Sequence, residues 1–337
     1  MDATQSESSR GTEAGFGLEK TPPTRSTERI GILLLGGFSL MALSAMSEPL
    51  RAANLISGKP HYEWNLLGLD DTPVPSSSGF PLVTEYTLEG APPFDMVTVL
   101  ASIGVRDHVT QRLLRWLRAV ARQGIPLCGV STAPYLLARA GLLEKQRCTV
   151  HWEFLRDFQE EFRTIPVERA LYVMDGNRLT CAGGTAAMDL MLALIAQRHG
   201  PALAAAIAEN FLHPRIRGGD ESQRMQVQWR YGVSDARLAK AIGFMEQNMQ
   251  IPQSPCAIAD MAGVSSRQLE RLFQKAFQAS PARFYLELRL KHARTLLRQS
   301  SESIQQIADR CGFSSVSHFS RAYRAVFADT PARSRTL

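Results

Sequence analysis

The order of apolar and polar residues divides the chain into two parts. From Ile30 to about Gly200, short apolar runs alternate with stretches in which apolar residues recur at helical spacing. Strands separated by helices are typical of a mostly parallel sheet with helices on both faces, so we predict an α/β domain over residues 29–215. The predicted strands are Ile30–Leu35, Trp64–Leu69, Met96–Leu100, Pro126–Val130, Ala170–Met174 and Leu179–Ala182. The predicted helices are Val109–Gln123, Pro134–Leu143, Trp152–Phe162, Thr185–Arg198 and Pro201–Asn210.

Two polar stretches flank this domain. Residues 1–28 are rich in Ser, Thr, Gly, Glu and Pro and poor in large apolar side chains, which predicts a disordered tail. Ile216 to Asp220 has turn chemistry, so we place a linker at residues 216–234. The pattern beyond it predicts helices only, and we assign residues 235–337 to a second, all-α domain.

The second domain contains an internal repeat. The segment Ala259–Ser266 matches Ala308–Ser315 at an offset of 49, and after one inserted residue the offset becomes 50. Glycines at 263 and 312 are expected to end a short helix, and the serine pairs that follow them are expected to cap the next one. Ser254-Pro255 and the pair Ser303 with Gln306 have the chemistry of helix starts. Each copy therefore predicts a helix-turn-helix unit.

The second helix of each unit is amphipathic. Its predicted core stripe is Leu269, Leu272, Phe273, Ala276 and Phe277 in the first copy, and Phe319, Ala322, Tyr323, Val326 and Phe327 in the second. For one helix, a solvated surface explains the polar face best; two such faces in a repeat favour binding in the major groove of DNA. Together with one residue of the connecting helix, the predicted DNA-binding residues are Ser266, Arg267, Gln268, Arg271, Gln274, Lys275, Arg294, Ser315, Ser317, His318, Arg321 and Arg324.

A predicted helix from Pro281 to about Gln299 connects the two copies and carries Arg294. At about 1.5 Å per residue it is roughly 28 Å long. Successive major-groove faces of B-DNA lie about 34 Å apart. One chain is therefore able to place the second helices of both units, called the recognition helices below, on one side of a duplex.

The charge distribution agrees with this assignment. The chain carries a net charge of +6, with 38 basic and 32 acidic residues. Residues 233–337 hold 15 basic and 8 acidic residues, a net of +7, which leaves −1 for the rest. An excess of this size favours a polyanionic partner, although it also fits an ordinary solvated surface.

The cysteines and one long uncharged segment indicate where in the cell the protein is expected. The five cysteines form no C-x-x-C pair, which favours a reducing cytoplasm and predicts neither a metal site nor a cofactor. Gly31 to Met46 is uncharged but shorter than the roughly 20 residues that span a bilayer. We interpret it as a strand, a Gly36-Gly37 turn and a helix, and expect no targeting or membrane segment.

Residues 235–337 resemble the AraC/XylS family of bacterial transcription regulators. The first copy matches in Ser266-Arg267-Gln268-Leu269, and the second in Gly312-Phe313, in Ser317 to Tyr323 and in Thr330-Pro331. The chain departs from the family at Ala328-Asp329, where a glycine usually follows the phenylalanine.

Residues 29–215 resemble the PfpI-like branch of the class I glutamine amidotransferase superfamily, as fused to AraC domains in amine- and amino-acid-responsive regulators. The motifs that carry the resemblance are Glu48 to Asn54, Leu136 to Leu143, Thr149-Val150-His151-Trp152 and Thr180 to Asp189. The resemblance implies a flavodoxin-like sheet with helices on both faces. It therefore implies a sensor domain on an enzyme scaffold.

The resemblance places Ser131 at the position of the cysteine that enzymatic members carry on a strained turn. Cys128 lies three residues earlier, inside a predicted strand, and is expected to be a buried apolar residue. Ser131 with His151 as a base would make a hydrolase or amidase. We favour a non-enzyme in which Ser131 caps the next helix and His151 forms a polar pocket wall, because the sequence shows neither an oxyanion site nor an acidic partner for His151.

We expect a small cationic amine, such as a betaine, carnitine or an amino-acid derivative, to bind beyond the carboxyl ends of the strands, at the switch in strand order, where we place Ser131 and Thr132. Trp152 is a candidate cation–π platform or a core residue, and Glu48 a charge partner or a surface carboxylate. The predicted ligand-binding residues are Glu48, Ser131, Thr132, His151 and Trp152.

These features predict a ligand-responsive transcription regulator, with activation of a catabolic operon as the leading interpretation. The predicted partners are double-stranded DNA and a small-molecule effector; RNA polymerase and a second copy of the chain are further candidates, and a membrane is not. The alternatives are the hydrolase tethered to DNA and a constitutive architectural DNA-binding protein.

Overall fold

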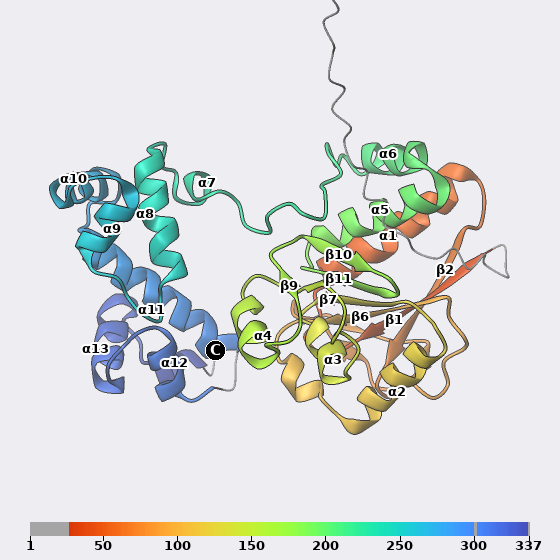
Figure 1. The fold of residues 1–337 in the computed structure, drawn as a ribbon. Helices are drawn as coiled ribbons and strands as arrows, with labels where there is room; N and C mark the ends of the chain where they lie inside the picture. The colour runs from red at the N-terminus through yellow and green to blue at the C-terminus, as the bar shows by residue number, and fades with distance from the viewer. Residues whose placement is uncertain (1–26, 300–301, 336–337) are drawn as a thin grey trace, which may run out of the picture. The chain divides into compact units, whose positions relative to one another are not determined.

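The computed structural model describes residues 27–299 and 302–335, which form two compact units (Figure 1). Unit 1 ends at Gln223 and unit 2 begins at Arg224. This division falls inside the segment 216–234 that the sequence predicts as a linker. The predicted disordered tail lies outside the described residues except for its end, where Glu28 is already part of the first strand.

Unit 1 is built on a seven-stranded sheet with the order β10-β11-β7-β6-β1-β2-β5. The neighbouring strands are parallel except for the antiparallel pair of β10 and β11 at one edge. The order β2-β1-β6-β7-β11 is that of a flavodoxin-like sheet, as the sequence predicts. The strands are β1 (Glu28–Leu34), β2 (Tyr62–Gly68), β5 (Tyr86–Thr87), β6 (Met96–Ala101), β7 (Leu127–Ser131), β10 (Tyr172–Asp175) and β11 (Arg178–Cys181).

Helices cover both faces of this sheet because its strands are apolar on both sides (Figure 1). In β1, Ile30 and Ile32 point into one apolar cluster and Leu33 into the other. The helices α1 (Leu40–Ser57), α5 (Ala186–His199) and α6 (Pro201–Asn210) contribute to the first cluster. The second contains side chains from α2 (Gln111–Arg122), α3 (Pro134–Arg139) and α4 (Leu155–Glu161).

Short elements that periodicity does not reveal complete unit 1. They are β3 (Val74–Pro75), β4 (Pro81–Leu82), η1 (Val105–His108), β8 (Cys148–Thr149) and β9 (Val167–Glu168). The helix predicted to reach Leu143 ends at Arg139, because Gly141 adopts a left-handed conformation (φ 73°) and turns the chain. Among the described residues, no helix is both long and apolar enough to cross a bilayer.

Unit 2 is helical throughout, and two apolar clusters form its core. The helices are α7 (Val227–Tyr231), α8 (Ala236–Gln247), α9 (Pro255–Ala262), α10 (Ser266–Phe277), α11 (Pro281–Gln299), α12 (Ile304–Arg310), α13 (Val316–Phe327) and α14 (Pro331–Arg335). The first cluster joins α8, α9 and α10, and the second joins α12 and α13. The connecting helix α11 contributes Tyr285 and Leu288 to the first cluster and Leu290, Ala293 and Leu297 to the second.

In unit 2, the predicted helix starts and caps are confirmed. Ser265 and Ser315 cap α10 and α13, and the side chains of Ser303 and Gln306 form a capping box at α12. The predicted core stripes are correct for Leu269, Phe273, Phe319 and Tyr323, which are buried. Ala276 and Val326 are exposed, contrary to the prediction, because each lies at the margin of the stripe rather than at its centre.

The departure from the family at Ala328 is a point of backbone strain. Ala328 ends α13 in the left-handed conformation (φ 55°), where its N–H donates to the carbonyl of Arg324 (2.9 Å). A residue with a Cβ pays roughly 1–2 kcal/mol for this conformation, which glycine adopts freely. The second helix-turn-helix unit therefore carries a local cost at this turn.

We expect Ala328→Gly to raise the free energy of unfolding of unit 2 by about 1 kcal/mol, measured by urea denaturation of the full chain. Ala325→Gly is the matched control, since Ala325 lies in α13 and is exposed. Glycine inside a helix lowers stability by about 0.5–1 kcal/mol, so the two variants should shift in opposite directions. Equal destabilisation by both would contradict a strained turn at Ala328.

Candidate nucleic-acid interface and ligand site

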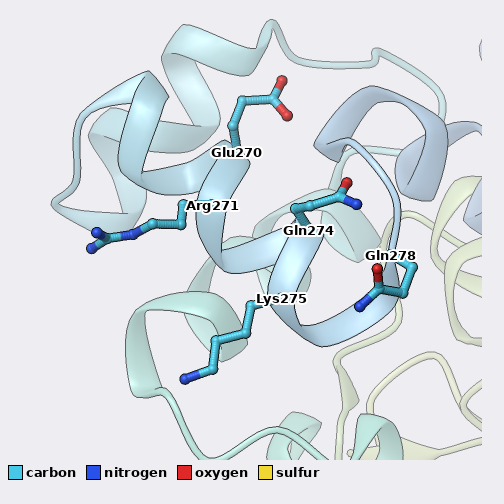
Figure 2. Close-up of a pocket in the computed structure, with 5 residues that line it drawn as sticks. All are labelled: Glu270, Arg271, Gln274, Lys275 and Gln278. Carbon is cyan, nitrogen blue, oxygen red and sulfur yellow. The ribbon is translucent and has the colours of Figure 1, made fainter.

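The polar face of α10 forms an open hollow of about 620 Å³. Its five lining side chains are all exposed, and Figure 2 shows Arg271 and Lys275 extending to the same side of the helix. The lining residues are Glu270, Arg271, Gln274, Lys275 and Gln278. Three of them belong to the predicted DNA-binding face; Glu270 and Gln278 were not predicted.

The cations on α10 have no acidic partners among the residues that the structure describes. Within the described residues, Arg267, Arg271 and Lys275 form no ion pair, whereas the exposed Arg283 and Arg237 of the same unit pair with carboxylates. Arg271 and Lys275 lie one helical turn apart, an arrangement that costs a few tenths of a kcal/mol by like-charge repulsion. An anionic partner such as a phosphate would remove this cost.

The second recognition helix, α13, presents a corresponding face. Ser317, His318, Arg321 and Arg324 are exposed, and neither arginine forms an ion pair within the described part of the chain. The ring of His318 packs edge-on against Phe313, with centroids 5.5 Å apart. Both helices therefore expose cations on the side opposite their buried stripes.

Two of the predicted DNA-binding residues take part in helix capping. The Oε1 atom of Gln268 accepts from the N–H of Ser265 (2.9 Å), so this side chain helps to form the start of α10. Ser315 Oγ accepts from the N–H of His318 (3.2 Å) at the start of α13. Ser266, the first residue of α10, is exposed beside the cap.

Two arginines of the connecting helix have structural partners. Arg289 donates to the carbonyls of Cys311 and Gly312 (both 2.6 Å) and stacks on Phe313, 4.3 Å from the ring centroid. Arg294, predicted to contact DNA, stacks on Phe327 at 4.8 Å, and its buried Nε has no hydrogen-bond partner among the described residues. Arg294 thus packs on the second apolar cluster, a role that charge counting did not reveal.

In unit 1, Ser131 occupies a strained turn between β7 and α3. Contrary to the prediction, it does not cap α3, because Ala133 is the N-cap residue and no side chain among the described residues caps this helix. Ser131 is almost fully buried and adopts a left-handed conformation (φ 63°). Neighbouring backbone fits closely around it, since a Cβ on Gly183 would lie 2.7 Å from the Ser131 Cβ. β7 pairs Ser131 with Ala101 of β6. Ser131 therefore lies one strand beyond the switch in strand order at β1 and β6, not at the switch itself.

His151 adjoins this turn through its backbone. The N–H of His151 donates to the carbonyl of Ser131 (3.1 Å), and burial lowers the pKa of the imidazole, which favours the neutral ring. Glu153 lies 3.7 Å from His151 Nδ1. The sequence did not reveal this acidic neighbour, because two residues of spacing do not fix where a loop carboxylate points.

The other predicted ligand residues have different environments. Thr132 is buried, and its hydroxyl donates to the carbonyl of Ser102 (2.7 Å), so it holds the loop rather than offering a free group to a ligand. Glu48 pairs with Arg51 on the surface of α1 (2.7 Å). Trp152 is 39% exposed and stacks near His151, so it is not a core residue. Cys128 is buried in β7, and burial raises the pKa of its thiol, as expected of an inert side chain.

Comparison with known proteins agrees with both units. Residues 28–197 match the DJ-1/PfpI family, and residues 258–336 match a helix-turn-helix domain. The chain is 43% identical over 314 residues to the HTH-type transcriptional regulator GbdR of Pseudomonas aeruginosa, covering 93% of this chain and 86% of the relative. It is 44% identical over 305 residues to the regulator CdhR of the same organism, covering 90% of each chain.

A solved structure extends the likeness to the fold of unit 1. The crystal structure of an AraC family transcriptional regulator from Pseudomonas putida is 28% identical, with a TM-score of 0.50, and covers 55% of this chain and 99% of its own. The relatives GbdR and CdhR are both named as regulators. The chain therefore belongs to the AraC-type helix-turn-helix transcription regulators with a DJ-1/PfpI domain, and it is a DNA-binding transcription regulator.

Proposed function

We propose that the protein activates transcription of a catabolic operon when unit 1 binds a small cationic amine or amino-acid derivative. The observation that carries the DNA-binding half of this proposal is the repeated pair of exposed faces on α10 and α13, whose arginines lack acidic partners in the described structure. The two helices enter successive major grooves on one side of a duplex. Arg267, Arg271 and Arg321 contact base edges, and Lys275 and Arg324 contact phosphates.

The ligand-binding half rests on the end of the sheet at Ser131 and His151. The half-exposed Trp152 beside His151 offers an aromatic face to a quaternary or primary ammonium group. A ligand that binds one conformation of unit 1 more tightly shifts its population and thereby changes DNA binding. Activation would also require a contact with RNA polymerase. A second copy of the chain is a further candidate partner.

We expect Arg267→Ala and Lys275→Ala to affect DNA binding in different ways. Selection from a random duplex pool with the full chain first yields a bound sequence. Arg267→Ala should then lose about 1–3 kcal/mol of discrimination at one base pair. Lys275→Ala should weaken all sequences evenly and reduce the slope of log K against log salt by about 1. Gel-shift titrations at several salt concentrations measure both effects.

Arg156→Ala is the control for these variants, because Arg156 is an exposed arginine of α4 that already pairs with Glu160 (2.8 Å). It should bind the selected duplex like the wild type. For Arg294→Ala, the free energy of unfolding is measured beside the DNA affinity, since Arg294 also packs on Phe327 and its loss alters the core. Wild-type binding by both Arg267→Ala and Lys275→Ala would show that the recognition face is wrongly assigned.

We expect a member of a panel of trimethylglycine, carnitine and amino-acid derivatives to raise the melting temperature of unit 1. At a concentration of about 100 times Kd, binding adds about 2.7 kcal/mol, or roughly 5 °C or more. Trp152→Ala should abolish the shift, and Trp229→Ala, which removes an exposed tryptophan of unit 2, should keep it. Absence of any shift and of any heat by calorimetry, in protein that binds DNA, would contradict an amine effector.

A hydrolase is the second candidate function, because the structure gives Ser131 a strained conformation and His151 an acidic neighbour. A fluorophosphonate probe tests it, since the Ser131 Oγ–P bond forms as fluoride leaves and the hydroxyl proton passes to His151. We expect no stoichiometric labelling of the wild type. Labelling that disappears in Ser131→Ala and persists in Ser44→Ala would overturn the non-enzyme assignment.

A further inference from the structure

The segment His213 to Gln223, called the strap below, follows α6 and ends unit 1. It is held to α5 by the carboxylate of Asp189, which has no exposed surface. Arg217 donates to this carboxylate through its Nε and its main-chain N–H (both 2.9 Å), and the ring of His213 lies 2.9 Å from the same group. Because separation would leave a buried charge without a partner, the start of the strap is firmly fixed.

The middle of the strap lies against the start of β10. The N–H of Leu171 donates to the carbonyl of Gly219 (2.8 Å), as in a short piece of sheet. A Cβ on Gly219 would lie 2.7 Å from the Tyr172 carbonyl oxygen, so only glycine permits this approach. The strap is thus an ordered part of unit 1 rather than a loose linker.

The end of the strap reaches the candidate ligand site. The Nε2 atom of Gln223 donates to the carbonyls of Val150 (3.0 Å) and Ala170 (2.7 Å). Val150 precedes His151, whose N–H is bound to the carbonyl of Ser131. Hydrogen bonds and one peptide link therefore connect the strained turn at Ser131 to Gln223.

The docked conformation of Gln223 is incompletely satisfied. Its Oε1 atom is buried and has no hydrogen-bond partner among the described residues. A buried acceptor without a donor lowers the stability of the arrangement that contains it. Release of Gln223 from Val150 and Ala170 would expose this oxygen to water. A released conformation therefore competes with the docked one.

The next residue belongs to unit 2. Arg224 forms two hydrogen bonds with Glu246 (3.1 and 3.2 Å), whose side chain is 7% exposed and is also bound by Arg230 and Tyr231. Burial alone raises the pKa of Glu246, but the arginines bring that pKa below its ordinary value, so the carboxylate stays charged. Successive residues of the chain are thus anchored in different units.

We propose that Gln223 is a positioning residue that couples the Ser131–His151 end of unit 1 to α7 and α8 of unit 2. An effector that displaces His151 moves Val150 and changes the docking of Gln223, and this change reaches Arg224 because the two residues are adjacent in the chain. This inference rests on the proposed ligand-responsive function. It assigns the route by which effector binding reaches the DNA-binding unit.

Hydrogen exchange of the full chain tests the coupling with DNA in place of the effector, because coupling between two sites is reciprocal. The probe is the duplex selected from the random pool. In the wild type, saturating duplex should change exchange at residues 148–152 and 213–223 by about fivefold or more. In Gln223→Ala the duplex should bind with unchanged Kd, and the change at residues 148–152 should be lost.

Gln226→Ala is the matched control, since Gln226 is exposed, lies three residues away and forms no side-chain hydrogen bond within the described residues. It should behave like the wild type in both measurements. Duplex binding without any change at residues 148–152, or a change that persists in Gln223→Ala, would overturn the coupling. Failure of the wild type to retain any duplex from the pool would instead overturn the proposed function, and the coupling with it.

Discussion

The geometry of the DNA-binding unit depends on one helix that belongs to two cores. α11 places Tyr285 in the first apolar cluster and Leu297 in the second, about 18 Å apart along its axis. The core of each helix-turn-helix unit therefore includes side chains of this one helix. Since successive residues of a helix are rotated by about 100°, one residue inserted between the clusters would turn one recognition helix away from the other. Arg289 supports this arrangement by joining α11 to the turn at Cys311 and Gly312.

The repeat gives the two recognition helices the same frame but different chemistry. Most corresponding positions have the same burial, including the exposed Ala276 and Val326; the exceptions are Val316 and Ser320, which are less exposed than Ser266 and Glu270. The polar faces differ: Gln274 corresponds to Arg324, and Lys275 to Ala325. If these faces contact bases as proposed, the two helices of one chain would read two unlike half-sites, whereas a dimer of identical helices imposes symmetry on its operator.

Much of this structure follows from local sequence signals. The caps at Ser265 and Ser315, the bounds of α11 and six of the seven strands of the sheet were predictable, because each depends on residues close in sequence. The two-residue strand β5 was not, because it is too short to show a pattern. The packing of Arg294 on Phe327 and the acidic neighbour of His151 were not, because they depend on where side chains of separate elements point. The strap was missed for the same reason: its polar residues read as a linker, and only the fold brings Arg217 to a buried aspartate.

The turn at Ser131 is strained although a serine stands where the enzymatic members carry a cysteine. A left-handed residue with a Cβ costs roughly 1–2 kcal/mol and persists where its surroundings fix it. Here the Thr132 hydroxyl donates to the Ser102 carbonyl, and the Ser131 carbonyl accepts from the N–H of His151. Residue 183 packs so closely on Ser131 that only glycine fits there. An enzyme uses such a turn to present a nucleophile. In a regulator the same turn presents its carbonyl to His151, and through Val150 this connects the sheet end to Gln223. The hydrogen bond from His151 therefore fixes the start of the His151 loop to the strained turn, and in the proposed function this is the loop that a ligand shifts.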